Sequence, residues 1–525
     1  MKEQNPLFSR SFLVLLIWFG SAFAFFACVT APVLQQYADF TFRNYDLGIY
    51  AQAAHAIRFS DLNPYLSTRL LHVFSDHFDP AVILLAPWAK LWDPGLVLIW
   101  ADSVFVGITG GLLTWLGWRN RLHPLWLMAI LLLLFFNLGT LQAVANPAHP
   151  STWTVLPIFL LGWALWSGRF YAIMSALVFL SLFKEEYVFC WCTVALWALF
   201  SRRWRLFGAC LLGFLVLVTW DFYFRFKLFP GPFMDYGGGL LAPLKENGFK
   251  NLKNLILQKY IGENGFHSIL RLVLPFLIFY LFIFRWWRLP IGLLLALLPI
   301  LAIRFLANKW GDHYGISVGA FGVALLFFGM VAPANLKSYL RTKSRSQLGG
   351  MAGLGLLTVL GCLFWMDAKF WRDFSNLQAL NSVSRDPDIQ NIRRKSIHQG
   401  IAFLLNHPKG NVIAEEHLVP NLAARSGVWQ LWRPVGWDGQ SHLYQLEGGQ
   451  RSSLYRYASP HPGLLLPARA ENADYFFLEN PDSGGSYAAM NAEEIRALIR
   501  CFRSDPAVLK IMDDGYAFLV RMPEP

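Results

Sequence analysis

The sequence contains few charged residues for its length. Of its 525 residues, 15% are Asp, Glu, Lys or Arg, whereas 55% are hydrophobic. Soluble proteins carry about 25% charged residues, so this chain has too few to cover a water-facing surface of its size. The composition excludes most soluble enzymes and disordered scaffolds, and it predicts an integral membrane protein. The net charge of +12 comes from basic residues in short loops between apolar runs, which indicates membrane topology and no nucleic-acid partner.

Cysteine is also scarce. The chain has 6 cysteines, and all but Cys501 lie inside apolar runs. The sequence has no CxxC pair, and it shows no repeat with a period of roughly 20–50 residues. A disulfide framework, a cysteine-based zinc site and a repeat architecture are therefore excluded.

The sequence is rich in long apolar runs. Several reach the roughly 17–25 residues that a transmembrane helix needs, and the region 124–200 contains shorter ones. Lipid offers no hydrogen bonds to an open sheet edge, so all spans are expected to be helical. The sequence predicts an α-helical polytopic membrane protein with about eleven transmembrane helices. They fall at about 11–33, 96–118, 124–140, 151–167, 170–184, 187–200, 206–224, 268–284, 289–306, 314–332 and 348–366.

The positions of Lys and Arg predict the orientation of these helices. Every second loop is basic, from Lys2 and Arg10 at the start to Lys337, Arg341 and Lys343 near the last span. By the positive-inside rule these loops are cytoplasmic. The N-terminus is then inside and, after an odd number of spans, the C-terminus is outside. Residues 1–366 form the predicted transmembrane domain, whose first outer loop covers about 35–95.

Residues 367–525 differ in kind, because no spanning run occurs there. Apolar residues at helical spacing predict a helix around 389–404, and a second helix is expected at 493–503. Buried strands are expected at 411–414 and 473–478. Two further strands flank Asp514-Gly515, a strong hairpin signal. This region is predicted to be a small extracytoplasmic α/β domain.

Unusual polar residues fall in the predicted outer loops. Ionisable residues at a membrane edge are costly and usually face a cavity. Their occurrence in four separate loops on one face therefore predicts an outward-facing polar site. The candidate residues are Asp46, Asp76, His77 and Asp79 in the first loop, Asn146 and His149 in the second, Lys184 and Glu185 in the third, and His313 and Tyr314 in the fifth.

Each of these residues also has a purely structural explanation. Asp46 fits a helix N-cap or a turn, Asp79 with Pro80 fits a turn before an apolar helix, and Lys184 fits an interfacial side chain that reaches toward water. Asp76, His77 and Asp79 are a candidate site for a divalent cation, and no other cofactor is expected. The prediction of a site rests on the occurrence of all these residues on one face of the membrane.

An ordered series of motifs resembles a known family. The motifs are NYDLGIYAQ at 44–52, DHFDP at 76–80, His149-Pro150, FKEE at 183–186, His313-Tyr314, NVIAEEHLVPNLAAR at 411–425 and ADYFFLEN at 473–480. On these motifs the chain resembles, over essentially its whole length, the bacterial membrane family named domain of unknown function 2079 (DUF2079). One departure is Ala51, where an acidic or polar residue is expected.

That family is similar to the GT-C glycosyltransferase superfamily. Those enzymes have many membrane helices, an acidic catalytic residue in the first outer loop and often a C-terminal soluble domain outside. The resemblance implies an inverting transferase at the outer face of the bacterial cytoplasmic (inner) membrane, surrounded by membrane lipid. It would move a sugar from a polyprenyl-phosphate donor to an envelope glycan or lipid acceptor. Asp46 or Asp76 would be catalytic, and His77, Asn146, His149, Lys184, Glu185, His313 and Tyr314 would bind substrate.

Two other functions remain open. One is a polytopic transporter, although transporters place their binding groups near the midplane, often on broken helices in paired repeats. The other is a membrane-anchored extracytoplasmic binding protein, which would not explain why polar residues gather in loops far upstream of the C-terminal domain.

Overall fold

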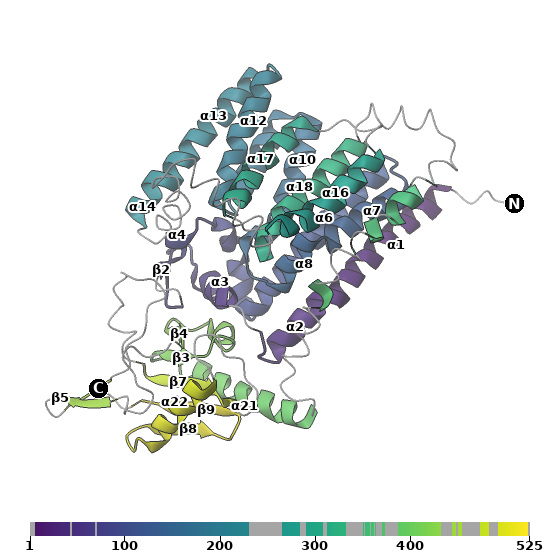
Figure 1. Ribbon diagram of the computed structural model, residues 1–525. Coiled ribbons are helices and arrows are strands. Elements are labelled where there is room, and N and C mark those ends of the chain that lie inside the picture. The colour runs from purple at the N-terminus through teal and green to yellow at the C-terminus, as the bar shows by residue number, and fades with distance from the viewer. Residues whose placement is uncertain are drawn as a thin grey trace. The chain divides into compact units, whose positions relative to one another are not determined.

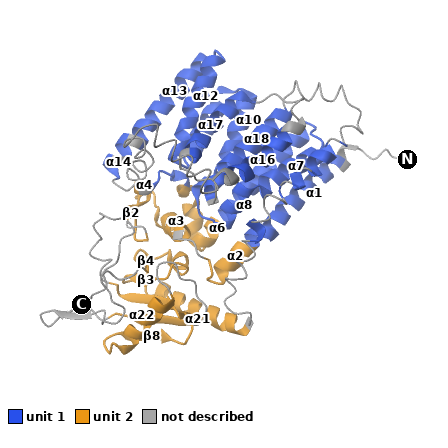
Figure 2. Ribbon diagram, viewed as in Figure 1, with its two compact units in different colours: residues 1–31, 77–81, 100–374 blue, residues 32–76, 82–99, 375–525 orange. Residues whose placement is uncertain are grey.

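The computed structural model describes most of the chain, and its contacts divide the chain into two compact units (Figure 2). Unit 1 comprises residues 1–31, 77–81 and 100–374, and unit 2 comprises residues 32–76, 82–99 and 375–525. The described residues are 6–42, 45–68, 71–229, 265–283, 290–307, 312–331, 350, 352–357, 359–361, 363, 370–372, 387–431, 444–447, 450–453, 473–481 and 492–522.

Two helical segments among the described residues are long and apolar enough to cross a membrane. The first is Arg10–Ala38, which runs through α1 (Pro6–Phe25), η1 (Phe26–Thr30) and α2 (Ala31–Ala38). The second is Pro94–Arg119, which is α6. A third span results if the bent pair α7 (Pro124–Phe136) and α8 (Leu138–Ala145) is counted as one. Among the described residues, these helices meet the length and composition that a membrane span requires (Figure 1).

Shorter apolar helices account for the other predicted spans. Every predicted segment up to residue 332 coincides with a helix or a run of helices, but most of these helices have fewer than 18 residues. The segment 348–366 lies partly outside the described residues. The prediction of about eleven full-length spans is therefore not confirmed. The shorter helices are α9 (Pro150–Trp153), α10 (Val155–Ser167), α11 (Phe170–Ser181), α12 (Val188–Phe200), α13 (Trp204–Thr219), η4 (Trp220–Phe224), α14 (Arg225–Leu228), α16 (Gly265–Ile283), α17 (Ile291–Ala307) and α18 (Gly315–Val331).

The bend between α7 and α8 has a local cause. The two helices meet at 41°, and Asn137 lies at the break. Its side chain accepts a hydrogen bond from the Thr140 amide, which caps α8, and its amide nitrogen donates to the Leu133 carbonyl at the end of α7. Gly319 of α18 permits this arrangement, because a Cβ there would lie 2.4 Å from Asn137 Oδ1. An apolar run that reads as one span is thereby split into two helices.

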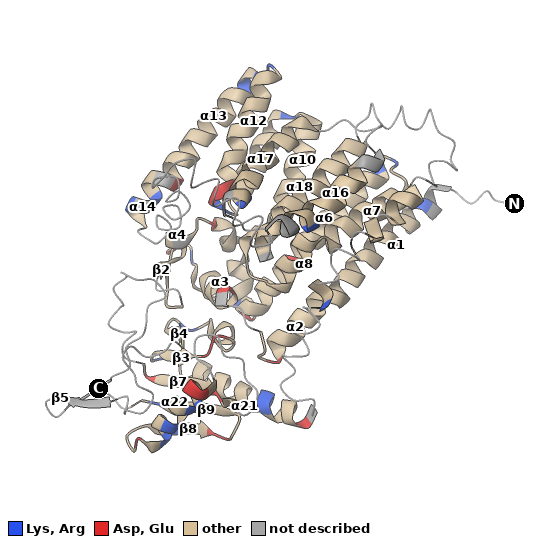
Figure 3. Cartoon of the chain, viewed as in Figure 1, with Lys and Arg blue, Asp and Glu red and all other residues tan. Residues whose placement is uncertain are grey.

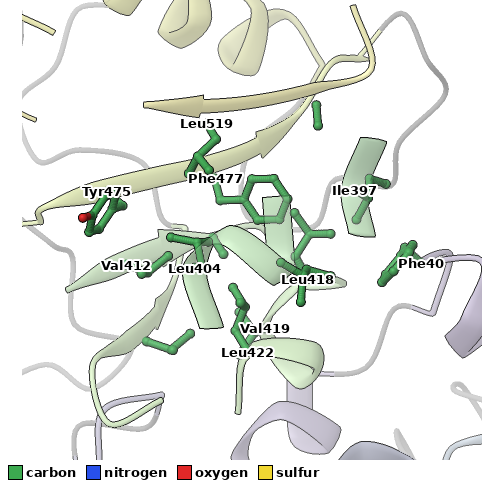
Figure 4. Packing of buried hydrophobic residues seen from close by; sticks show 14 residues of the cluster. Phe40, Ile397, Leu404, Val412, Leu418, Val419, Leu422, Tyr475, Phe477 and Leu519 are labelled. Atoms are coloured by element: carbon green, nitrogen blue, oxygen red, sulfur yellow. The ribbon is translucent and has the colours of Figure 1, made fainter. Parts of the chain in front are cut away.

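Unit 2 contains a five-stranded mixed sheet in the order β4-β3-β7-β9-β8. The central strand β3 is parallel to both β4 and β7, while β9 is antiparallel to β7 and β8. Helix α22 packs on one face of the sheet, and α21 packs on the other, whose buried residues Figure 4 shows. The elements are β3 (Val412–Ala414), β4 (Val428–Gln430), β7 (Tyr475–Glu479), β8 (Leu509–Asp513), β9 (Ala517–Arg521), α21 (Pro387–Asn406) and α22 (Ala492–Ser504).

The secondary-structure predictions for this region are confirmed, while its extracytoplasmic location stays a prediction. Both predicted helices form, as α21 and α22, and the buried strands form as β3 and β7. The Asp514-Gly515 turn joins β8 and β9, and Gly515 has a φ of +90°. The Asp514 side chain accepts hydrogen bonds from the Tyr516 and Ala517 amides, which fixes the turn.

Most of the first predicted outer loop, all but residues 77–81, belongs to the same compact unit as the C-terminal sheet. Gln52 donates hydrogen bonds to Ser67 and to the Arg425 carbonyl, and Ser67 bonds the backbone of Val428 at the start of β4. Phe40, only 1% exposed, is part of the hydrophobic cluster on the α21 face (Figure 4). Hydropathy alone grouped this loop with the membrane helices. The loop contains α3 (Tyr45–Ala56), β1 (Tyr65–Leu66), β2 (Leu71–His72), α4 (Val73–Asp76), η2 (Pro80–Leu85) and α5 (Ala86–Leu91).

Candidate functional site

Polar residues from separate loops of unit 1 come together in one group. Charged side chains are otherwise sparse along the helices of this unit (Figure 3). The group, called here the polar cluster, comprises His77, His149, Lys184, Glu185, Glu186, Arg304, His313 and Tyr314. Six of these residues were predicted from the sequence as substrate-binding residues.

Glu185 and His77 form a hydrogen-bonded pair in the polar cluster. His77 Nδ1 lies 2.9 Å from Glu185 Oε1, and the Phe78 amide donates to Glu185 Oε2 at 3.3 Å. Glu185 begins the short helix η3 (Glu185–Tyr187), between α11 and α12. Burial by itself would raise the pKa of Glu185, but His77, Lys184 and Arg225 together lower it to about 2. Glu185 is therefore a carboxylate at neutral pH.

Two cations lie against one aromatic ring. Lys184 Nζ is 4.8 Å from the centre of the Tyr314 ring, and the Arg304 guanidinium carbon is 4.9 Å from it. Arg304, in α17, also forms a buried ion pair with Glu186. The ring stabilises both cations through its negative face. Lys184 thus supplies a positive charge at the end of the loop that precedes η3.

The rings of His149 and His313 meet edge to face, with centroids 3.5 Å apart and an angle of 62° between their planes. Burial is the largest effect on both imidazoles, and the nearby charge of Lys184 adds to it. The pKa of His149 falls to about 3, and the pKa of His313 falls far below its usual value. Both rings are therefore neutral at pH 7, and each offers one N–H donor and one acceptor nitrogen.

A buried carboxylate in α6 fixes the turn that carries His149. Asp102 accepts hydrogen bonds from the Ala148 amide at 3.1 Å and from Trp153 Nε1 at 2.5 Å. Ala148 has a φ of +80°, which a residue with a Cβ rarely adopts. Pro150 then starts α9 directly after His149. The two hydrogen bonds hold this strained turn in place.

Sequence reasoning missed Asp102, Arg304 and Glu186 as site residues. Glu186 appeared only as part of the FKEE motif. Asp102 and Arg304 are single charged residues inside apolar runs, which is a recognisable signal of a functional group within the membrane region.

The other sequence-predicted residues lie in several places. Asn146 is the C-cap of α8, with its amide bonded to the Gln142 carbonyl. Asp79 is 3% exposed and directly precedes η2, as the turn explanation predicts. Asp46, in the first turn of α3, and Asp76, the last residue of α4, belong to unit 2.

Gly48 lies inside α3, where the chain is helical. A Cβ at this position would lie 2.8 Å from Val419 Cγ1 in η8 (Val419–Leu422). The glycine is thus explained by the close packing of α3 against η8.

A metal site receives no support from the described residues. Among them, no group of three or more His, Cys, Asp or Glu side chains is placed to hold a metal ion. The side chain of Asp76, one of the three candidate ligands, lies outside the described residues.

These observations define a helical membrane protein with a partly buried polar cluster at the ends of its helices. The chain belongs to the family described as predicted membrane protein DUF2079, whose model matches residues 36–448. That range covers the first loop, all residues of the polar cluster and the start of the C-terminal sheet. Comparison with curated proteins finds no match.

Proposed function

We propose that the protein is an inverting membrane glycosyltransferase of the GT-C type. It transfers a sugar from a polyprenyl-phosphate donor to a glycan or lipid acceptor at the outer face of the bacterial cytoplasmic membrane. The observation that carries this proposal is the meeting of Lys184 with His77, His149 and His313 in one polar cluster. Cations and N–H donors of this kind suit the phosphate of a lipid-linked donor.

The charges of the polar cluster favour an anionic ligand. Glu186 pairs with Arg304, and Glu185 pairs with His77. The positive charge of Lys184 is then available to a phosphate as a point charge. Burial strengthens such an interaction, because few water molecules screen it.

The transfer reaction needs the cation and N–H donors of the polar cluster when the donor bond breaks. When the bond between the anomeric carbon and the phosphate oxygen breaks, negative charge grows on the departing phosphate. Lys184 and the N–H groups of the neutral imidazoles would stabilise that charge in the transition state. His149 and His313 are suited to this because they donate a hydrogen bond without adding a charge that Lys184 would repel.

The acceptor hydroxyl must lose a proton as it attacks the sugar. Asp46 is the proposed general base, and Asp76 is its rival. Asp46 lies in the first turn of α3, where the helix dipole favours a carboxylate. This supports an ionised side chain able to accept a proton.

A transporter is the second candidate, and one observation favours it. The bent pair α7 and α8 is a broken apolar helix, and transporters often build their binding sites on such helices. The two functions differ in what happens to the bound molecule, which is either chemically changed or moved.

The deciding experiment uses the purified protein in lipid vesicles with a radiolabelled polyprenyl-phosphate sugar and an envelope extract as acceptor. Label should move into the acceptor with the wild type and fail to do so with Lys184→Met. Mass spectrometry of envelope glycans and lipids with and without the gene then names the product. Counter-ion-dependent uptake of a solute into the vesicles, without sugar transfer, would contradict the proposal and favour the transporter.

A further inference from the structure

Polar side chains occupy the carboxyl ends of all three parallel strands in the C-terminal sheet. Gln430 is the last residue of β4, Glu479 is the last residue of β7, and Glu415 and His417 directly follow β3. Strand β3 comes first in the chain, and the later strands β4 and β7 lie on its two sides. In open α/β sheets, ligands bind outside the carboxyl ends of strands at such a reversal of strand order.

Gln430 and Glu479 lie on one face of the sheet, and Glu415 and His417 lie in the loop at its edge. Residues at alternate positions of β3, β4 and β7 pack in the cluster on the α21 face, among them Val412, Val428 and Phe477. The same alternation places Gln430 and Glu479 on this face. Arg393 of α21 accordingly reaches Glu479 and forms a buried ion pair with it.

Several buried polar atoms at this edge have no hydrogen-bond partner among the described residues. They are Glu415 Oε2, His417 Nδ1 and Gln430 Oε1. Each residue is at most 3% exposed. A buried polar group without a hydrogen bond is energetically costly. These atoms are therefore expected to bond a group outside the described residues.

The hydrogen bonds of this network limit how the remaining atoms can bond a ligand. His417 Nε2 donates to the Glu479 carboxylate at 2.9 Å, which leaves Nδ1 to bond a further group. Glu415 Oε1 accepts from the Glu479 amide at 2.7 Å. Burial, and next the charge of Glu479, raise the pKa of Glu415 well above its usual value. The proton of a neutral Glu415 then sits on Oε2, which becomes a donor.

A hydroxyl group completes this arrangement. Glu415 Oε2 and His417 Nδ1 are 3.8 Å apart, too far for a direct bond. A hydroxyl between them would accept from Glu415 and bond His417 Nδ1 as either donor or acceptor, and a second hydroxyl would donate to Gln430. An ammonium group cannot accept the first bond, and a fully ionised phosphate cannot donate the second. The charge of Glu479 further disfavours an anion.

We propose that Glu415, His417 and Gln430 form a binding site for an uncharged ligand with several hydroxyl groups, of the class of a sugar. The site lies within unit 2. The inference goes beyond the proposed transfer reaction and does not rest on it, because it concerns binding by the C-terminal sheet.

The test uses the full-length protein in detergent and saturation-transfer difference NMR. The probes are the methyl glycosides of glucose, galactose, mannose and N-acetylglucosamine. At least one of them should receive saturation from the wild type. His417→Gln keeps a donor toward Glu479 but removes Nδ1, and Gln430→Met removes the Oε1 acceptor with little change in size. Each should weaken glycoside binding about tenfold, the usual worth of one buried hydrogen bond.

His407→Gln is the matched control, because His407 is an exposed histidine in the same unit, and it should bind the glycoside like the wild type. If His417→Gln does not fold, Gln430→Met decides. The proposal is overturned if no glycoside binds the wild type, which would leave the edge filled by water only. Equal affinity of Gln430→Met and the wild type would overturn it as well. Glycoside binding is measured without donor and without transfer, so the failure of this proposal and of the transfer reaction are distinguishable.

Discussion

The rings of His149 and His313 have their centroids 3.5 Å apart, although the residues come from different loops of the chain. Protonation of either ring is energetically unfavourable, because each ring is buried near the other and near Lys184. This relationship makes the stability of unit 1 depend on pH.

We expect the protein to lose stability as the pH falls below about 6.5. The pKa of His149 is about 3 when folded and about 6.5 when unfolded. Below pH 6.5 the unfolded chain therefore binds a proton that the folded chain does not, which favours unfolding. At pH 5 this costs about 2 kcal/mol. Thermal melts between pH 8 and pH 5 should show a smaller decline for His149→Asn than for the wild type. Parallel slopes for His149→Asn, the wild type and the exposed control His407→Asn would contradict this.

Lys184→Met should weaken binding of the lipid-phosphate donor by about 10-fold to 100-fold, the worth of a buried hydrogen bond to a charged group. Binding of a short-chain polyprenyl-phosphate sugar can be measured by microscale thermophoresis. Lys227→Met is the matched control, since Lys227 also lies over a tyrosine ring, that of Tyr223, but is exposed. Unchanged donor affinity in Lys184→Met would mean that Lys184 only anchors the membrane interface.

Asp46→Asn should lower sugar-transfer turnover by a factor of about 10² to 10⁴, the usual contribution of a general base. The variant keeps the size and hydrogen bonds of the side chain but loses the proton acceptor. Donor affinity and the melting temperature should stay at wild-type values. Normal turnover in this variant together with an inactive Asp76→Asn would assign the role to Asp76, and Asp61→Asn serves as an exposed control in the same loop.

The predicted orientation of the chain can be tested with a reporter enzyme that is active only in an oxidising exterior. Fused after residue 525, it should be active, because the positive-inside rule predicts an outer C-terminus. Fused within 338–346, it should be silent. The opposite pattern of activities would reverse the orientation and place the polar cluster in contact with cytoplasmic substrates.

Gly48→Ala should destabilise the protein by about 1–3 kcal/mol, the usual cost of overpacking. The added Cβ would lie 2.8 Å from Val419 Cγ1, so α3 and η8 must move apart. Thermal melts at neutral pH measure the effect. Gly107→Ala in α6 is the control, since a Cβ there meets nothing within 4 Å. Equal melting temperatures for the two variants would show that the packing at Gly48 is easily relaxed.

Much of the local structure could be predicted from the sequence. Apolar runs predicted the membrane helices, and helical spacing predicted α21, because both patterns depend only on neighbouring residues. The strands β8 and β9 followed from Asp514-Gly515, whose turn geometry is set by the residues themselves. Six of the eight residues of the polar cluster were named for the same kind of reason, because polar side chains at the ends of apolar runs are costly and can be recognised locally.

Only the tertiary structure decided which of these elements belong together. No pattern near Gln52 predicts its hydrogen bond to the Arg425 carbonyl, and none near Asn137 shows that α18 has a glycine where the bend needs room. The bonds from Ala148 and Trp153 to Asp102 likewise join residues far apart in the chain. The sequence by itself determined the class of protein and its helices, since hydropathy and turn chemistry are local. The partners of buried polar groups depend on long-range packing, which a single sequence does not encode in any local pattern.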